Sequence, residues 1–282
     1  MQKKIVVNGV TLSYKEIGTG DKYLISTQNF FLKDSHMELL GKPPYDYHVF
    51  LITMRGYGES DHVFDSTPQD YVKLWGEDVI AFAKAMEIDR FYYSGVSHGC
   101  FAGWYIAFHK PWLLKGFVPT SGVAQFIRSE ARKMPTVSIT DIDEIVGNYE
   151  ALKKMAWIEH WPTQNSERLE RREANHLNHL ETLMNRRKEE FLITNNNISG
   201  SEAATVEEFE ERLSGLEVPI LIINGMLDQL STPEKALRAA KLIPGAQLLI
   251  YQHFGHGGPD ECPEIIARDC DRFFQDIEGR IL

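Results

Sequence analysis

Gly95-Val96-Ser97-His98-Gly99 is the stretch of this sequence that decides the fold, because of what stands on either side of it. A short apolar run typical of a buried strand leads into it, and small and aromatic residues typical of a buried helix follow. A turn this tight between strand and helix strains the backbone of the serine and leaves room only for glycine beside it. The turn would expose the serine hydroxyl at the C-terminal edge of a sheet, with N–H groups at the helix start free to bind an oxyanion.

Strand-like and helix-like segments alternate on both sides of this turn. Residues 4–7 and 10–15 form two alternating patterns joined by Asn8-Gly9, a pair that accepts the positive φ angles of a tight hairpin. The composition predicts further strands at 23–27, 49–53, 91–95, 116–119, 218–224 and 247–251, and helices at 70–86, 100–108, 166–191, 233–242 and 264–277. This order is typical of an α/β protein with a mostly parallel, doubly wound sheet.

The composition of the whole chain narrows the choice of partners. The 282 residues are 43% hydrophobic and 25% charged, with a formal net charge of −10. An acidic surface repels phosphate backbones and anionic lipids, so we expect no nucleic acid and no membrane as partner. The N-terminus lacks the apolar segment of a signal peptide. The cysteines at 100, 262 and 270 have no spacing typical of disulfides or metal knuckles, so we expect a cytoplasmic protein.

Residues 125–216 differ in amino-acid composition from the rest of the chain. Of these 92 residues 29 are charged, about 32%, against 41 of the other 190, about 22%. The segment holds three glycines and is otherwise rich in helix formers, and its charge runs are most simply solvated helix faces. We therefore expect a helical cap at 125–216, inserted into a sheet domain made of 1–124 and 217–282.

Two later segments supply what a serine nucleophile needs. A serine hydroxyl reacts poorly at neutral pH unless a base lies within hydrogen-bond reach and a carboxylate orients that base. Asp228 follows the expected strand at 218–224, and His256 follows the strand at 247–251. Because parallel strands deliver their C-terminal loops to one edge, Ser97, Asp228 and His256 are expected to meet there.

Together these features give the chain a resemblance to the capped α/β-hydrolases over nearly its whole length. The resemblance rests on the Asn8-Gly9 hairpin, the loop Arg55-Gly56-Tyr57-Gly58-Glu59-Ser60 (R-G-x-G-x-S), the turn at 95–99, the G-x-x-D at 225–228 and Gly255-His256. It implies Ser97 as nucleophile, Asp228 as acid and His256 as base, in the chain order typical of the fold. It also implies that the loop at 55–60 is structural.

Rival assignments exist for each partner of Ser97. His253 lies three residues before His256, but the flanking glycines and the family's G-H pattern favour His256. Some relatives carry the acid after the sixth strand, where this chain has Thr120-Ser121-Gly122 and no carboxylate. The side chain of His98 is expected to pack or hydrogen-bond rather than to act as a second base.

The oxyanion hole departs from the pattern of the resemblance. Relatives usually have His-Gly and an apolar residue after the third strand, and the matching positions here are Gln28-Asn29-Phe30. The chemistry needs a backbone amide and not a particular side chain, so the N–H groups of Phe30 and His98 are the expected donors.

Substrate contacts are expected from aromatic residues near the entrance. Phe30, Trp157 and Trp161 are the candidates, the two tryptophans sharing one helical face just before Pro162. Packing within the cap is the simpler explanation of the tryptophans, and substrate contact is the alternative.

The leading interpretation is a serine hydrolase that cleaves an ester or another carbonyl-containing small molecule through an acyl-enzyme. We expect no cofactor and no metal. A carbon–carbon bond hydrolase, a lyase or a cofactor-free oxygenase could use the same three residues, and the altered segment at 28–30 keeps a hydrolase-like ligand receptor open. The substrate and the choice between monomer and homo-oligomer are left open.

Overall fold

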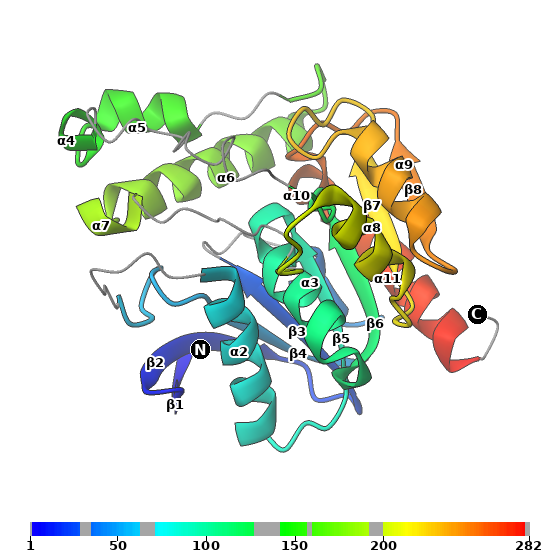
Figure 1. Ribbon diagram of the computed structural model, residues 1–282. Coiled ribbons are helices and arrows are strands. Elements are labelled where there is room, and N and C mark those ends of the chain that lie inside the picture. The colour runs from blue at the N-terminus through cyan, green and yellow to red at the C-terminus, as the bar shows by residue number, and fades with distance from the viewer. Residues whose placement is uncertain are drawn as a thin grey trace.

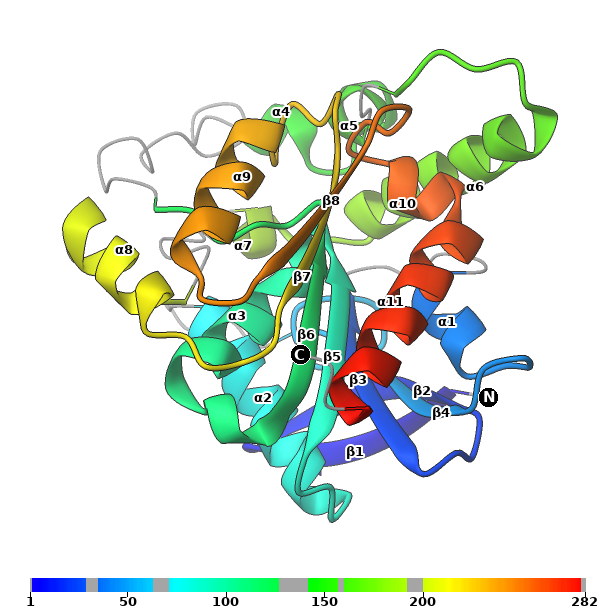
Figure 2. The ribbon, with the colours of Figure 1, turned by 90° about the vertical axis from the view of Figure 1, so that its right-hand side faces the viewer.

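Eight strands form one sheet through the middle of the molecule, with helices on both faces (Figures 1 and 2). The structure is a computed structural model and describes residues 2–28, 35–62, 71–126, 142–156, 160–191 and 200–279. Within these ranges the strands run in the order β1-β2-β4-β3-β5-β6-β7-β8. Their bounds are β1 Gln2–Val7, β2 Val10–Ile17, β3 Lys22–Gln28, β4 Tyr47–Thr53, β5 Phe91–Val96, β6 Leu114–Thr120, β7 Leu221–Gly225 and β8 Gln247–Tyr251.

The sheet is antiparallel at one side and parallel through the rest. β1 and β2 form the hairpin, and β2 pairs antiparallel with β4. All pairs from β4 through β3 to β8 are parallel. Asn8 and Gly9 turn the hairpin with φ angles of 49° and 75°, as their sequence predicts. The mostly parallel α/β sheet expected from the sequence is confirmed.

Each face of the sheet has its own apolar core. On one face lie α2 (Tyr71–Ala85), α3 (Cys100–His109), α8 (Val206–Ser214) and α9 (Pro233–Leu242). On the other lie α1 (His36–Leu40) and α11 (Pro263–Glu278). Because both faces are covered, the parallel strands read as nearly continuous apolar runs. No helix in the described ranges combines the length and apolarity needed to cross a membrane.

A further layer of helices lies beyond the carboxyl ends of the strands (Figure 1). It consists of α4 (Ile142–Ile145), α5 (Tyr149–Ala156), α6 (Ser166–Met184) and α7 (Lys188–Phe191). These helices share a small apolar cluster of their own, which includes Leu152 and Leu180. α8 packs differently, because Phe209 and Leu213 belong to the core under α9. Whether 125–216 is a separate cap is not decided by these contacts and stays a prediction.

The helix expected at 166–191 is interrupted in the structure. α6 ends at Met184, and the N–H of its C-cap Asn185 bonds back to the Glu181 carbonyl. The Glu190 carboxylate then accepts the N–H of Arg187 at 2.6 Å, so the chain starts the short helix α7 instead of continuing α6. A glutamate at the third helical position that accepts the N–H of the N-cap residue in this way stabilises the new helix start.

A buried ion pair ties the loop at 55–60 to α2. Arg55 donates from Nε and Nη2 to the two carboxylate oxygens of Asp78, at 2.7 and 2.5 Å. Their side chains are only 9% and 4% exposed. Trp75 Nε1 donates to the Arg55 carbonyl, and the Ser60 hydroxyl donates to the carbonyl of Thr53 at the end of β4. The loop therefore holds α2 against the sheet.

Glu261 joins α6 to the loop that follows β8. Its carboxylate lies on the short helix α10 (Gly258–Glu261), is 2% exposed and is 2.7 Å from His160 Nδ1. It also accepts hydrogen bonds from Nε and Nη2 of Arg168, at 2.9 and 2.7 Å, and of Arg172, at 3.0 and 3.1 Å. Burial by itself raises the pKa of Glu261, but the hydrogen bonds from His160, Arg172 and Arg168 outweigh burial and lower it to about 2.

Arg168 and Arg172 also donate hydrogen bonds to backbone carbonyls near Glu261. Arg168 Nη2 donates to the carbonyl of His253 at 3.0 Å, three residues before His256. Arg172 Nη2 donates to the carbonyl of Trp161 at 2.9 Å. The first half of α6 is therefore fixed to the segment that carries His256.

We predict that Asp78→Asn destabilises the fold strongly. The change keeps the shape of the side chain but leaves the buried Arg55 guanidinium without its counter-charge, which costs about 3–5 kcal/mol. The free energy of unfolding in urea should fall by about that amount. The exposed Asp89→Asn is the matched control and should stay within about 0.5 kcal/mol of the parent. A loss no larger than that of the control would show that the ion pair contributes little.

We predict that Glu261→Gln destabilises the protein by about 3 kcal/mol or more at neutral pH, since two partly buried arginines lose the buried carboxylate between them. The native pKa of Glu261, about 2, lies below that of an unfolded glutamate, about 4.3. Its contribution is thus fully present above roughly pH 4.5 and is lost as the pH falls toward 2.

Thermal unfolding measured from pH 7 down to pH 2.5 should therefore show the gap between parent and variant closing below about pH 4.5. Glu264→Gln, which removes the half-exposed carboxylate bound by Arg171, is the control and should cost no more than about 1 kcal/mol. A gap that stays constant with pH would contradict the assignment to the ionised carboxylate.

Candidate active site

The turn at 95–99 has the strained geometry that its sequence predicts. Ser97 has a φ of 49°, in the left-handed region that residues other than glycine rarely adopt. It opens the short 3₁₀ turn Ser97–Gly99, which leads directly into α3. A Cβ on Gly95 would lie 2.5 Å from the Gly99 carbonyl oxygen, and one on Gly99 would lie 2.3 Å from the carbonyl oxygen of Thr27. No side chain fits at either glycine.

Three side chains from distant loops meet beside this turn. His256 Nε2 lies 2.8 Å from Ser97 Oγ. His256 Nδ1 lies 2.9 and 3.0 Å from the two carboxylate oxygens of Asp228. Asp228 and His256 are only 2% and 7% exposed. Because a carboxylate can only accept, Nδ1 carries the proton and Nε2 is left to accept the hydroxyl proton of Ser97.

Backbone contacts fix Asp228 relative to His256. The N–H groups of Leu230 and Ser231 donate to Asp228 Oδ1 at 3.0 and 2.8 Å. The loops after β7 and β8 are also bonded to each other, since the Leu227 N–H donates to the Phe254 carbonyl at 3.0 Å. Adjacent parallel strands bring both loops to one edge, as expected from the sequence.

His253, the rival of His256, occupies a different position. Its side chain is exposed, and its ring packs against Trp161 with the ring centres 4.9 Å apart. Among the contacts of the described residues, none joins its ring to Ser97 or Asp228. The geometry thus favours His256 as the partner of Ser97.

The side chain of His98 is packed among aromatic rings. Its ring centre lies 4.9 Å from that of Trp75, 4.8 Å from Phe101 and 6.1 Å from Tyr57. Burial lowers its pKa to about 3, with a smaller contribution from the charge of Arg186. A ring that stays neutral at pH 7 in such surroundings is a packing element, as the sequence predicts.

The structure describes Trp161, one of the three residues predicted to contact the substrate. Phe30 and Trp157 lie outside the described residues, so their proposed roles stay predictions, as does the role of the His98 N–H. Trp161 is described, but α5 ends at Ala156 and Trp161 is not helical. The expected shared helical face is therefore wrong for Trp161, because the following Pro162 disfavours helical backbone at the residue before it.

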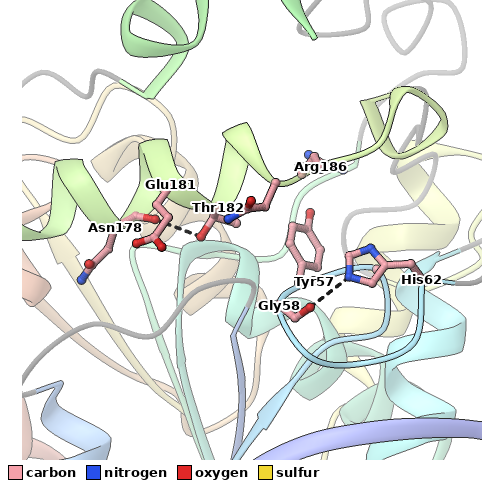
Figure 3. Close-up of a pocket in the computed structure, with 9 residues that line it drawn as sticks. Tyr57, Gly58, His62, Asn178, Glu181, Thr182 and Arg186 are labelled. Carbon is pink, nitrogen blue, oxygen red and sulfur yellow. Dashed lines mark hydrogen bonds between the residues drawn. The ribbon is translucent and has the colours of Figure 1, made fainter. Parts of the chain in front are cut away.

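A polar cavity lies between the loop at 56–58 and the second half of α6 (Figure 3). Its volume is about 250 Å³. The described lining residues are Gly56, Tyr57, Gly58, His62, Asn178, Glu181, Thr182, Asn185 and Arg186. Tyr57 lines the cavity, and its ring packs edge-on against that of His98, with the ring centres 6.1 Å apart. Sequence reasoning missed this cavity because its two walls lie more than a hundred residues apart; its one signal was the R-G-x-G-x-S loop.

Comparison with known proteins places the chain in a family. The model of the alpha/beta hydrolase fold family matches residues 31–261. No curated protein matches the chain. Among solved structures, the chain is similar to an enol-lactonase from Burkholderia xenovorans LB400, with a TM-score of 0.74 and 19% identity over 97% of this chain and 100% of that one.

Two esterases are similar to the same degree. A thermophilic esterase from Thermogutta terrifontis with malate bound has a TM-score of 0.73 and 19% identity over 98% of this chain and 99% of that one. Esterase RhEst1 from Rhodococcus sp. ECU1013 has a TM-score of 0.73 and 18% identity over 98% and 99%. At such identities the likeness speaks for the fold alone. Since the family model spans most of its residues, this chain belongs to the α/β-hydrolase fold family.

Proposed function

We propose that the protein is a serine hydrolase that cleaves an ester or a related carbonyl compound through an acyl-enzyme. The observation that carries this proposal is the unbroken line of hydrogen bonds from Asp228 through His256 to Ser97. Family membership supports hydrolase chemistry in general, and neighbours of the same fold are named as esterases and a lactonase. Cleavage of an ester bond by this chain is our inference from the site.

In the first half of the reaction, Ser97 Oγ attacks the carbonyl carbon while His256 Nε2 takes its proton. Asp228 holds the ring and stabilises the imidazolium that forms. We assign the developing oxyanion to the backbone N–H groups of Phe30 and His98. As the tetrahedral intermediate collapses, the C–O bond to the leaving group breaks and His256 returns the proton to the departing oxygen.

In the second half, water replaces the alcohol. His256 takes a proton from the water, whose oxygen attacks the acyl carbon of the acyl-enzyme. The bond from that carbon to Ser97 Oγ then breaks, and the proton on His256 goes to Ser97. The carboxylic acid leaves and the hydroxyl is restored.

We further propose that residues 125–216 cap the site, over a core of 1–124 and 217–282. In support, α4 to α7 share their own apolar cluster beyond the carboxyl ends of the strands, and α6 lines the cavity beside His98. With a volume of about 250 Å³, the cavity has room for part of a small-molecule substrate. Three free thiols, at 100, 262 and 270, are in keeping with a cytoplasmic location.

We predict that a fluorophosphonate labels Ser97 alone. Intact-mass measurement should show one adduct on the parent protein and none on Ser97→Ala. Ser121→Ala is the matched control, since Ser121 also has a φ of 49° and its buried hydroxyl has no hydrogen-bond partner among the described residues. It should label like the parent. Labelling of Ser97→Ala would overturn the nucleophile, and labelling of the parent without turnover of any ester would favour the receptor.

We predict that His256→Ala abolishes hydrolysis of nitrophenyl esters and that His253→Ala keeps most of it. Loss of the base in such a triad costs on the order of 10⁶-fold in kcat, whereas the exposed His253 ring packs against Trp161. Both rates are measured at pH 8 with proteins shown by circular dichroism to be folded. Equal losses in the two variants would remove the reason to prefer His256.

A further inference from the structure

The positively charged side chain of Arg186 forms part of the wall of the cavity. Its guanidinium carbon lies 5.0 Å from the ring centre of Tyr57 and 5.0 Å from that of Phe191, so the cation lies over the faces of two aromatic rings. Nη2 donates to the carbonyl of Glu190. Nε is buried and has no hydrogen-bond partner among the residues that the structure describes.

The carboxylates near Arg186 do not balance its charge. Glu190 is fully buried, but its Oε1 is 2.5 Å from His62 Nδ1 and its Oε2 accepts the N–H of Arg187 at 2.6 Å. Glu181, the one carboxylate in the described cavity wall, is exposed at the rim. Within the described ranges, no carboxylate oxygen lies within 4.0 Å of the Arg186 guanidinium. A cation partly withdrawn from water without a counter-charge is costly, so a bound anion would be stabilised here.

The wall of the cavity also lies close to the residue that follows the nucleophile. Tyr57, which packs under the Arg186 guanidinium, lies 6.1 Å from the His98 ring between ring centres. His98 directly follows Ser97. A long acyl chain on Ser97 that passed the ring of His98 would meet Arg186 in this cavity.

We propose that the substrate is an ester or lactone that bears a carboxylate remote from the scissile carbonyl, and that Arg186 binds this carboxylate in the cavity. The inference rests on the proposed function, because it takes Ser97 as the nucleophile. Arginine suits this role, since its planar fork matches the two oxygens of a carboxylate. Arg186 would set the preference for acidic substrates.

The test compares esters that differ only in the end group. Mono-p-nitrophenyl esters of the diacids from succinate to suberate are paired with p-nitrophenyl esters of the monocarboxylic acids of equal carbon number. For at least one chain length, the parent enzyme should favour the acidic ester by about 10–100-fold in kcat/KM, the range expected for a charge-assisted hydrogen bond. Because both esters react with one preparation, the ratio does not depend on how much of the enzyme is folded.

Arg186→Gln should reduce this preference to about one, mainly through a higher KM for the acidic ester. Arg187→Gln removes the neighbouring exposed arginine, which is not part of the cavity wall, and should keep the preference of the parent. Equal loss in both variants would point to general charge and overturn the specific role of Arg186. A parent with no preference at any chain length, but with normal Ser97 labelling, would overturn the inference and leave the proposed function standing.

A second measurement needs no turnover. Monomethyl glutarate and monomethyl adipate should raise the melting temperature of Ser97→Ala and should not raise that of Ser97→Ala/Arg186→Gln. If the acids bind in this way while Ser97 is neither labelled nor active toward esters, the anion site stands and the proposed hydrolysis fails. If neither acid raises the melting temperature of Ser97→Ala, the carboxylate site is refuted.

Discussion

The backbone of Ser97 is the constraint on which the site depends, because β5 must become α3 within a few residues. Its φ of 49° places the side chain where β5 ends, and such a conformation costs on the order of 1–3 kcal/mol. Close packing offsets that cost. A Cβ on Gly122 would lie 2.6 Å from the Ser97 carbonyl oxygen, and one on Gly103 of α3 would lie 2.6 Å from the Tyr93 ring. The helix thus sits against β5 and β6 with no room to relax the turn.

His256 is positioned from two sides by different parts of the chain. On one side Asp228 holds its ring, through a loop bonded to the end of β8. On the other side, five residues further on, Glu261 binds Arg168 and Arg172 of α6. The contacts of Glu261 therefore hold both the first half of α6 and the segment that carries His256, the proposed base. Since the second half of α6 forms a wall of the cavity, the contacts of Glu261 help to position both the proposed base and the cavity.

Local chemistry explains which parts of this arrangement could be predicted from the sequence. The limits of α9 and β8 follow from Pro233 at the helix start and from turn residues around a short apolar strand, and both agree with the structure. The meeting of Ser97, Asp228 and His256 could be expected because parallel strands share one edge. The contacts of Glu261 with Arg168 and Arg172 could not be predicted, because the two arginines lie 93 and 89 residues away along the chain. Their charge runs look like those of any solvated helix, and only the docking of α6 makes them partners. The cavity beside Arg186 could not be predicted either, because its walls also come from segments far apart in the sequence.

The net charge of the protein determines how Arg186 would recognise an acidic substrate. A net charge of −10 repels anions at long range, so an acidic substrate gains nothing from electrostatic steering. Recognition of a carboxylate must then come from short-range contacts in a site with little water, where a charge-assisted hydrogen bond is strongest. The contacts of the guanidinium with the rings of Tyr57 and Phe191 meet that need, because aromatic rings shield part of the cation from water. A lysine at this position would offer neither the flat faces nor the fork. The surroundings of residue 186 thus suit an arginine that binds an anion at contact distance, on a surface that otherwise repels one.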